Sequence, residues 1–251
     1  MSASTLGEWL ASAPFSLTMS SGFFGFFAHA GLAQALEERG LFPARVSGSS
    51  AGALVGGLWA GGQRATAIVD ELQRLDRRTF WDPAPGVGLL RGRLFHDRLS
   101  ELMPATFAGC RVPFAASVFD VVTRRTVVLD EGPLPAAVQA SCTFPGLLQP
   151  VRLGGRTLID GGVLDRPGLA GMPATDRLLY HHIASRSPWR RGSAVALPER
   201  PGMVAFQIEN LPRSGPFKLD EGRRAMRLAY RAARRALDAP LEPLITEHAR
   251  P

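Results

Sequence analysis

The spacing of apolar positions predicts alternating strands and helices in the first part of the chain. Phe15 to Met19 is expected to form a short strand, and Phe26 to Arg39 a helix that Gly40 closes as a C-cap. Arg45 to Ser47 is expected to form the next strand, and the small apolar residues from Ala51 to Ala60 the next helix. This order of strands and helices indicates an α/β fold with a mostly parallel central sheet.

In the rest of the chain, the pattern of apolar and turn residues predicts further helices, two hairpins and two more sheet strands. Helices are expected at Ala65 to Leu75, Asp97 to Met103, Leu134 to Ser141 and Gly222 to Leu237. Hairpins are expected where Val112 to Val122 meets Thr126 to Leu129, and where Val151 to Leu153 meets Thr157 to Ile159. The strands are expected at Arg177 to Ile183 and Met203 to Ile208, with an Arg/Ser/Pro-rich surface loop from Ser185 to Pro201 between them. No internal repeat or domain boundary is visible, so we expect one domain over residues 1–251, with its motifs in about 15–167.

The composition is that of a globular protein with a basic balance. The 251 residues are 45% hydrophobic and 20% charged, which is enough to bury one sizeable core. Basic residues outnumber acidic ones 29 to 22, and the net charge of +7 permits an anionic partner without naming one. The arginines are scattered and no nucleic-acid-binding motif accompanies them, so nucleic acid is not expected as a partner.

One basic stripe on the last helix fits either a solvated face or peripheral contact with an anionic membrane. It consists of Arg224, Arg227, Arg231 and Arg235.

The two cysteines and the N-terminus narrow the class of protein further. Cys110 and Cys142 have no paired spacing and no neighbouring histidine, so neither a disulfide framework nor a zinc site is supported, and no metal or cofactor is expected. The segment from Met1 to Ser12 lacks the basic start and long apolar run of a secretory signal. No stretch reaches the ~20 apolar residues of a membrane span. We therefore expect a cytoplasmic protein, with peripheral membrane contact and the oligomeric state left open.

The strongest chemical signal is a G-x-S-x-G motif where a strand meets a helix. Gly48 and Gly52 flank Ser50, and this context predicts a tight turn that presents the serine hydroxyl as a nucleophile above the sheet edge. The amides at the start of the helix from Ala51 favour negative charge on that oxygen. The alternatives are a glycine-rich turn without chemistry and a phosphate-binding loop. The phosphate-binding loop is the weaker of the two because its lysine is missing.

An acyl-transfer serine also needs an oxyanion hole and a base. The backbone amides of Gly22 and Phe23, in the loop after the first strand, are candidates for the oxyanion hole. Asp160 ends a predicted hairpin strand and is the candidate base, with Gly161 and Gly162 allowing close approach. Taken alone, the first segment could be a plain strand-to-helix connection and the second a turn.

These motifs occur in an order that resembles the patatin-like phospholipase family. The match covers roughly Phe15 to Pro167, and it implies a three-layer fold with helices on both faces of a central sheet. It also implies a dyad of Ser50 and Asp160, without histidine or metal, acting on lipid acyl esters such as glycerophospholipids or lysophospholipids. Five segments carry the resemblance: Gly22 to Gly31, Ala33 to Gly40, Gly48 to Leu54, Ala140 to Gly146 and Asp160 to Gly162.

Two other functions stay open at this point. Ser50, Asp160 and then His181 or His182 follow the chain order of an α/β-hydrolase triad, although both histidines lie in a strand-like run. The second alternative is a non-catalytic lipid-binding protein of the same fold. It rests on the glycine loop, where the family usually has three consecutive glycines and this chain has Ser20-Ser21-Gly22.

Two further features have open interpretations. His29 falls within a predicted helix and is expected to be a packed or capping residue rather than a base. An aromatic cluster lies beside the proposed oxyanion loop and fits either the core or an acyl-chain channel. It consists of Phe23, Phe24, Phe26 and Phe27.

Overall fold

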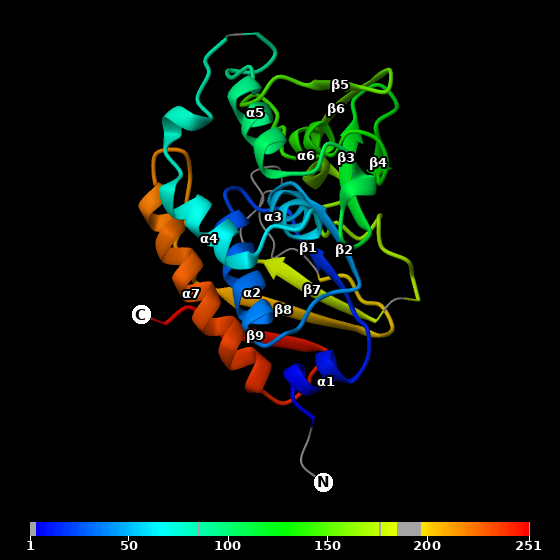
Figure 1. Cartoon of the computed structure of the whole chain (residues 1–251), viewed down its shortest axis with the longest axis vertical. Helices are drawn as coiled ribbons and strands as arrows, with labels where there is room; N and C mark the ends of the chain where they lie inside the picture. The colour runs from blue at the N-terminus through cyan, green and yellow to red at the C-terminus, as the bar shows by residue number, and fades with distance from the viewer. Residues whose placement is uncertain (1–3, 85, 176, 185–196, 251) are drawn as a thin grey trace.

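The computed structural model describes residues 4–84, 86–175, 177–184 and 197–250 (Figure 1). Within these residues nine strands form one sheet, in the order β5-β6-β3-β2-β1-β7-β8-β9 with β4 also paired to β3. Strands β1, β2, β3, β7, β8 and β9 pair in parallel, whereas β4, β5 and β6 join through antiparallel pairs. The strands are β1 (Ser16–Met19), β2 (Arg45–Ser49), β3 (Phe114–Asp120), β4 (Arg125–Leu129), β5 (Val151–Leu153), β6 (Arg156–Asp160), β7 (Leu178–Ile183), β8 (Met203–Glu209) and β9 (Leu244–His248).

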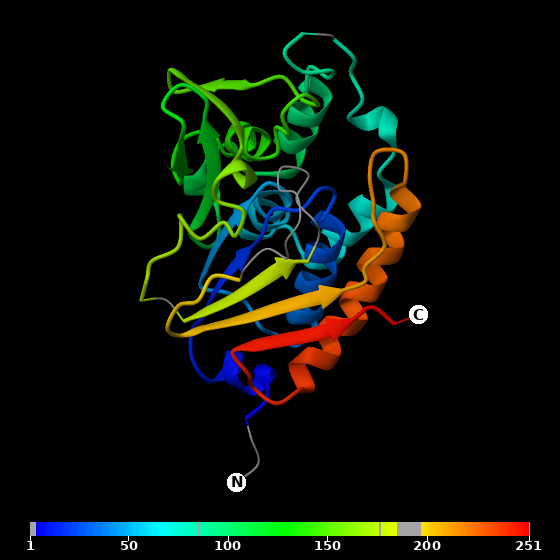
Figure 2. The ribbon, with the colours of Figure 1, turned by 180° about the vertical axis from the view of Figure 1, so that it is seen from behind.

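Helices pack on this sheet and complete the layers. Helices α2, α3, α4 and α7 contact one another on one face of the sheet, as the two opposite views show (Figures 1 and 2). The α-helices are α1 (Leu6–Ser12), α2 (Phe26–Glu38), α3 (Ala51–Ala60), α4 (Ala65–Arg74), α5 (Arg93–Leu102), α6 (Leu134–Ser141) and α7 (Leu219–Asp238). Short 3₁₀ helices are η1 (Arg77–Thr79), η2 (Phe107–Gly109) and η3 (Gly161–Val163).

The segment 164–172 covers the other face of the central strands. The carbonyl of Gly168 in this segment accepts hydrogen bonds from Thr18 Oγ1 of β1 at 3.0 Å and from Ser47 Oγ of β2 at 2.8 Å. The small hydroxyl side chains therefore face a backbone layer, whereas their neighbours along each strand face the helices. The result is a three-layer α/β fold with a mostly parallel central sheet, so the predicted fold class is confirmed. Over these strands the second face is covered by the described segment 164–172, which contains no α-helix, where helices were expected.

Local sequence explains why the central elements pack so closely. Every residue of β1 and of β7 is buried, as expected for strands covered on both faces. Helix α3 is also buried on every side, and a Cβ atom at Gly56 would lie only 3.0 Å from Val46 Cγ1 of β2. The small residues of α3 thus let a helix lie directly on the strand that precedes it.

Several element boundaries differ from the sequence prediction. Both predicted hairpins are confirmed, as is the helix Leu134–Ser141. Strand β2 extends two residues further than expected, through Ser49, so the turn narrows to Ser50 alone. Helix α5 begins at Arg93 rather than Asp97, because the carboxylate of Asp82 accepts hydrogen bonds from the amides at its start, including Arg93 at 2.7 Å. Helix α1 and strand β9 were not predicted. Residues 185–196 of the expected surface loop lie outside the described residues.

The basic helix α7 has the two stripes that its sequence predicts. Met226, Ala233 and Leu237 are buried against the body of the protein, while Arg224, Arg227 and Arg231 are exposed. Arg235 is less exposed and pairs with Glu247 of β9 at 2.8 Å, and Arg224 pairs with Glu221 of the same helix at 3.9 Å. Among the described residues, no helix is both long and apolar enough to span a bilayer.

Candidate active site

The turn between β2 and α3 places Ser50 in a strained conformation. Ser50 has φ 52° and ψ −116°, in the left-handed region of φ that a residue other than glycine rarely adopts. A Cβ atom at Gly48 would lie 2.4 Å from the carbonyl carbon of Gly52, and one at Gly52 would lie 2.0 Å from the carbonyl oxygen of Met19. Both flanking positions therefore require glycine, which is the physical reason for the motif's spacing.

The structure brings Ser50 and Asp160 together from segments 110 residues apart. Ser50 Oγ donates a hydrogen bond to Asp160 Oδ2 at 2.6 Å, and the amide of Gly162 donates to Oδ1 at 2.7 Å. Asp160 ends β6, and its own amide donates to the carbonyl of Thr143 at 3.0 Å. The carboxylate is thus fixed on both oxygens, with one of them on the serine.

Close backbone approach around Asp160 depends on the two glycines that follow it. A Cβ atom at Gly161 would lie 2.1 Å from the carbonyl oxygen of Ser117 on β3. One at Gly162 would lie 2.3 Å from Ser21 Oγ. Neither position accepts a larger residue unless the backbone or these neighbours shift.

Burial changes the proton affinity of Asp160. The side chain is nearly inaccessible to solvent, and desolvation raises the pKa of its carboxyl to about 6, while the hydrogen bonds from Ser50 and Gly162 offset part of the rise. Asp160 is therefore mostly ionised at pH 7 and is a stronger base than an ordinary aspartate. A carboxylate of this kind, hydrogen-bonded to a hydroxyl, can accept the hydroxyl's proton.

Ser141 and Cys142 hold the backbone of Ser50, a role that no local sequence pattern assigned to them. The amide of Ser50 donates to Ser141 Oγ at 2.9 Å, and that hydroxyl donates to the carbonyl of Ser117 at 2.7 Å. The Cys142 thiol donates to the carbonyl of Ser50 at 3.2 Å. Both residues lie in the segment Ala140 to Gly146, which is one of the five segments that carry the family resemblance. That resemblance was the only feature of the sequence that pointed to them.

The loop between β1 and α2 lines the same cavity and contains backbone amides without a hydrogen-bond acceptor in the described part of the chain. Among the described residues, the amides of Gly22, Phe23 and Phe24 donate to no acceptor, and all three residues line the cavity that Ser50 lines. The loop is closed by a hydrogen bond from the amide of Gly25 to the carbonyl of Gly22 at 2.7 Å. Donors without a partner beside a nucleophile can receive a developing negative charge.

The loop after β1 is held by hydrogen bonds to the end of β7 and to Arg166. The Ser20 amide donates to the His181 carbonyl at 3.1 Å, and the Ile183 amide donates to Ser20 Oγ at 2.8 Å. The Ser21 amide donates to the carbonyl of Arg166 at 2.7 Å. A Cβ atom at Gly22 would lie 2.9 Å from Ile183 Cγ2, so the loop sits directly on β7.

The three buried histidines make contacts of their own, His29 with His181 and His182 with Tyr180. His29 Nε2 lies 2.8 Å from the carbonyl of Ser20 and so carries the hydrogen, which leaves His29 Nδ1 to accept from His181 Nδ1 at 2.8 Å. His182 Nδ1 is bonded to the Tyr180 hydroxyl at 2.8 Å. Burial lowers the pKa of His29 and His182 to about 4 and that of His181 well below its usual value.

None of these histidines lines the cavity that contains Ser50. They are neutral at pH 7, and among the described residues none bonds to Ser50 or Asp160. The structure therefore does not bring together the serine, the aspartate and a histidine.

The cavity itself is large and mostly apolar. Its volume is about 190 Å³, and Ser50 and Asp160 lie in its wall. Phe23, Phe24 and Phe26 line it, whereas Phe27 is fully buried in the core. Of the aromatic cluster, three members thus face the cavity and one packs in the core. The other apolar lining residues include Leu54, Leu58, Leu72, Leu99 and Leu102.

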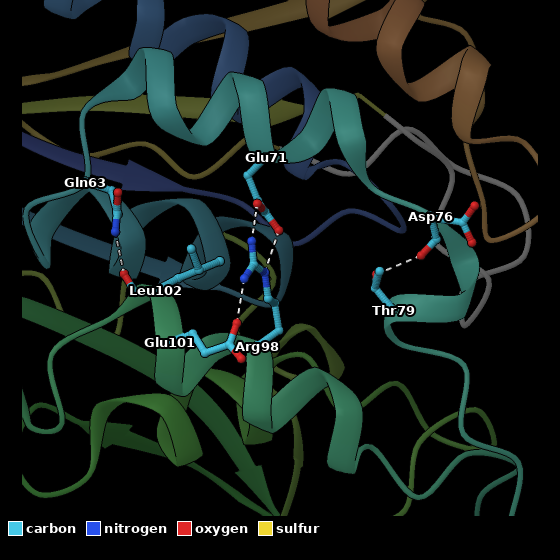
Figure 3. Close-up of polar contacts among 7 residues, drawn as sticks. All are labelled: Gln63, Glu71, Asp76, Thr79, Arg98, Glu101 and Leu102. Carbon is cyan, nitrogen blue, oxygen red and sulfur yellow. Dashed lines mark hydrogen bonds and ion pairs between the residues drawn. The ribbon is translucent and has the colours of Figure 1, made fainter.

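An ion pair joins α4 to α5 in the wall of this cavity (Figure 3). Arg98 donates from Nε to Glu71 Oε1 at 2.7 Å and from Nη2 to Glu71 Oε2 at 2.5 Å. Arg98 Nη1 also donates to Glu101 at 2.5 Å. The two-point geometry fixes the spacing of the helices between which the cavity lies.

Comparison with known proteins decides the family. The model of the patatin-like phospholipase family matches residues 17–171, which is more than half of the chain. The chain belongs to the patatin-like phospholipase family. This membership supports lipid hydrolase activity, and the match contains Ser50 and Asp160.

Relatives and a solved structure agree with the family. An NTE family protein of Mycobacterium tuberculosis is 36% identical over 154 residues, which are 59% of this chain and 42% of that protein. The lysophospholipase NTE1 of Mycosarcoma maydis is 30% identical over 146 residues, 55% of this chain and 8% of that protein. The chain thus spans less than half the length of these relatives. The crystal structure of VipD from Legionella pneumophila has the same fold, with a TM-score of 0.64 at 15% identity over 90% of this chain and 67% of that one.

Proposed function

We propose that this protein hydrolyses acyl esters of phospholipids or lysophospholipids through a dyad of Ser50 and Asp160. The single observation that carries the proposal is the 2.6 Å hydrogen bond from Ser50 Oγ to Asp160 Oδ2 in the wall of an apolar cavity. An activated hydroxyl in an acyl-chain-sized apolar space has the parts that a lipid esterase requires.

The first half of the reaction forms an acyl-enzyme. Asp160 takes the proton of Ser50 Oγ as that oxygen attacks the ester carbonyl carbon. The resulting oxyanion accepts hydrogen bonds from the amides of Gly22 and Phe23. When the intermediate collapses, the bond to the alcohol oxygen breaks, and the departing alcohol takes the proton from Asp160.

The second half returns the enzyme to its starting state. A water molecule gives a proton to Asp160 and attacks the acyl carbonyl, and the same amides hold the second oxyanion. Collapse of this intermediate breaks the bond to Ser50 Oγ, which regains its proton from Asp160. The products are one fatty acid and the deacylated lipid.

The test is a comparison of three proteins on soluble p-nitrophenyl esters and on lysophosphatidylcholine. The wild type is expected to hydrolyse both classes, and Ser50→Ala and Asp160→Asn are expected to lose turnover while remaining folded. Turnover that survives in the Ser50→Ala protein would overturn the proposal. A folded wild type that binds lipid but hydrolyses none of these esters would instead favour the non-catalytic lipid-binding alternative.

A further inference from the structure

Exposed apolar side chains gather where three separate segments meet beside the cavity. Phe217, in the loop before α7, is 69% exposed, and Phe23, in the loop after β1, is 46% exposed and lines the cavity. Trp81 follows η1 and stacks edge-on against Phe217, with ring centroids 5.4 Å apart. We call Phe23, Arg77, Trp81 and Phe217 the aromatic rim.

Contacts between the segments hold the aromatic rim together. The Arg77 guanidinium lies 4.8 Å from the Phe217 ring centroid and 5.5 Å from that of Trp81. A Cβ atom at Gly215 would lie 3.7 Å from the Phe23 ring, so the loop before α7 also reaches the oxyanion loop. Figures 1 and 2 both show this loop beside the segment that follows α4.

The aromatic rim continues into the cavity through further aromatic side chains. The Phe23 ring lies 5.0 Å from that of Phe24 and 5.2 Å from that of Phe144, both of which line the cavity. Phe24 in turn lies 6.2 Å from Phe80, another lining residue next to Trp81. An apolar chain that enters at the aromatic rim therefore meets aromatic surface on its path towards Ser50.

The charge around the aromatic rim is positive. Segments 76–81 and 211–220 together contain four basic and two acidic residues. Asp76 is bonded to Arg78, and Asp220 is bonded to Arg223. Arg213 and Lys218 are exposed and have no ion-pair partner among the described residues. Aromatic side chains flanked by cations match the interface of an anionic bilayer, where rings lie at headgroup depth and basic side chains meet phosphates.

We propose that the aromatic rim is the surface by which this protein docks on an anionic lipid bilayer, with Phe217 inserted at headgroup depth and Arg77 on lipid phosphate. The proposal rests on the proposed function in one respect, since the cavity beside the rim is the reason for a lipid partner. It differs from contact through the arginine stripe of α7, because it brings the mouth of the cavity to the membrane. Docking this way lets an acyl chain pass from the bilayer into the cavity without crossing water.

Vesicle co-sedimentation tests the docking surface apart from catalysis. All variants are made in the full chain carrying Ser50→Ala, so that lipid is not consumed, and are measured on phosphatidylcholine vesicles with and without phosphatidylglycerol. Phe217→Ser is expected to weaken binding to phosphatidylglycerol-containing vesicles about tenfold, from the lost burial of one aromatic side chain. Arg77→Gln is expected to weaken that binding about fivefold and to weaken binding to phosphatidylcholine by a smaller factor.

Two matched controls define the result that would overturn the proposal. Phe42 is another exposed phenylalanine, at 59%, and packs beside Trp59 away from the aromatic rim, so Phe42→Ser should leave vesicle binding unchanged. Arg227 and Arg231 are exposed on α7 without an ion pair among the described residues, and their double change to Gln should cost less than Phe217→Ser. Equal binding by the Phe217→Ser and Phe42→Ser proteins, or a larger loss from the α7 variant, overturns the proposal.

A second readout separates this proposal from the proposed function. With Ser50 intact, Phe217→Ser is expected to keep wild-type turnover of a soluble short-chain ester and to lose turnover of vesicle lipids. If the wild type hydrolyses no soluble ester but Phe217→Ser still weakens vesicle binding, the proposed function fails and the docking surface stands. If turnover is present and Phe217→Ser changes neither binding nor vesicle hydrolysis, the docking surface fails and the proposed function stands.

Discussion

Two buried polar clusters flank the same residue of the central strand, and they differ in what they can do. Met19 of β1 is paired with Gly48 on one side, next to the Ser50 turn, and with His181 on the other. On the first side Asp160 gains proton affinity and its partner Ser50 lines a cavity. On the second side His29 and His181 lose proton affinity and bond to each other and to backbone. Burial alone therefore does not make a base, because the group must also keep enough affinity for a proton and lie beside the nucleophile.

The largest expected effect comes from removing the charge of Asp160. Asp160→Asn keeps a side chain of the same shape but cannot accept the Ser50 proton, so kcat/KM should fall by about 10³-fold. Steady-state kinetics on a soluble ester measures the fall, and Ser50→Ala gives the background. Retention of activity within about tenfold of wild type would contradict the assignment of Asp160 as the base.

The second effect concerns the backbone of the Ser50 turn. Gly52→Ala places a Cβ atom 2.0 Å from the Met19 carbonyl oxygen, so the free energy of unfolding should fall by about 2–4 kcal/mol. Chemical denaturation measures this change. Gly215→Ala is the matched control, because its new Cβ meets nothing closer than 3.7 Å and should change stability by at most about 0.5 kcal/mol. Similar stability of the two variants would mean that the turn is looser than the structure indicates.

Replacing the buried histidines should lower the stability of the protein and change its turnover little. The double change His181→Ala and His182→Ala leaves buried partners without hydrogen bonds and should cost about 2–4 kcal/mol of folding stability. Turnover in the folded protein should stay within about tenfold of wild type, with an unchanged midpoint in the pH–rate profile. If turnover is lost while the protein stays folded, a histidine base replaces Asp160 in the mechanism.

The pH–rate profile reports the ionisation of the base. Asp160 acts only when ionised, and burial raises its pKa to about 6, so kcat/KM should rise with pH through about 6 and level off above it. An ordinary aspartate would give full activity already near pH 5. A midpoint well below pH 5 would show that the carboxyl is more solvated than its position indicates.

The stability contributed by Asp160 and that contributed by the buried histidines should change with pH in opposite directions. The folded-state pKa of Asp160 lies above its ordinary value, so its contribution to stability is present at low pH and is lost as pH rises from about 4 to about 6. The folded-state pKa values of His29 and His182 lie near 4, below the ordinary value of histidine. The stability that these two histidines contribute is therefore lost as pH falls from about 6.5 to about 4. Thermal denaturation should therefore show Asp160→Asn gaining stability relative to wild type as pH rises from 4 to 7. A difference in stability between Asp160→Asn and wild type that does not change with pH would contradict this prediction.

The order of elements and the main chemical residues could be predicted because their signals are local. The G-x-S-x-G spacing can be read within five residues, although the contact that requires Gly52 is with Met19 of β1. Asp160 was found because its segment follows the others in family order. The start of α5 could not be found in this way, since its cap is Asp82, eleven residues before Arg93 in the chain. The same holds for Ser141, which reaches Ser50 only through the folded chain.

The histidine pair shows why chain order alone misleads. His181 and His182 follow Ser50 and Asp160 as in a triad, but consecutive strand residues point to opposite faces. His181 meets His29 of α2 in the helical layer, while His182 shares the other face with Tyr180. Neither direction leads to Ser50, and only the pairing of β7 with β1 reveals this.

The most direct test of the account is reaction with a fluorophosphonate probe, with the modified residue located by mass spectrometry. The account predicts labelling of Ser50 in the native protein and its collapse in Asp160→Asn, with labelling retained when His181 and His182 are changed to Ala. Labelling at Ser50 that is indifferent to Asp160, or an absence of labelling in a folded native protein, would contradict the claim that these two residues form an activated pair.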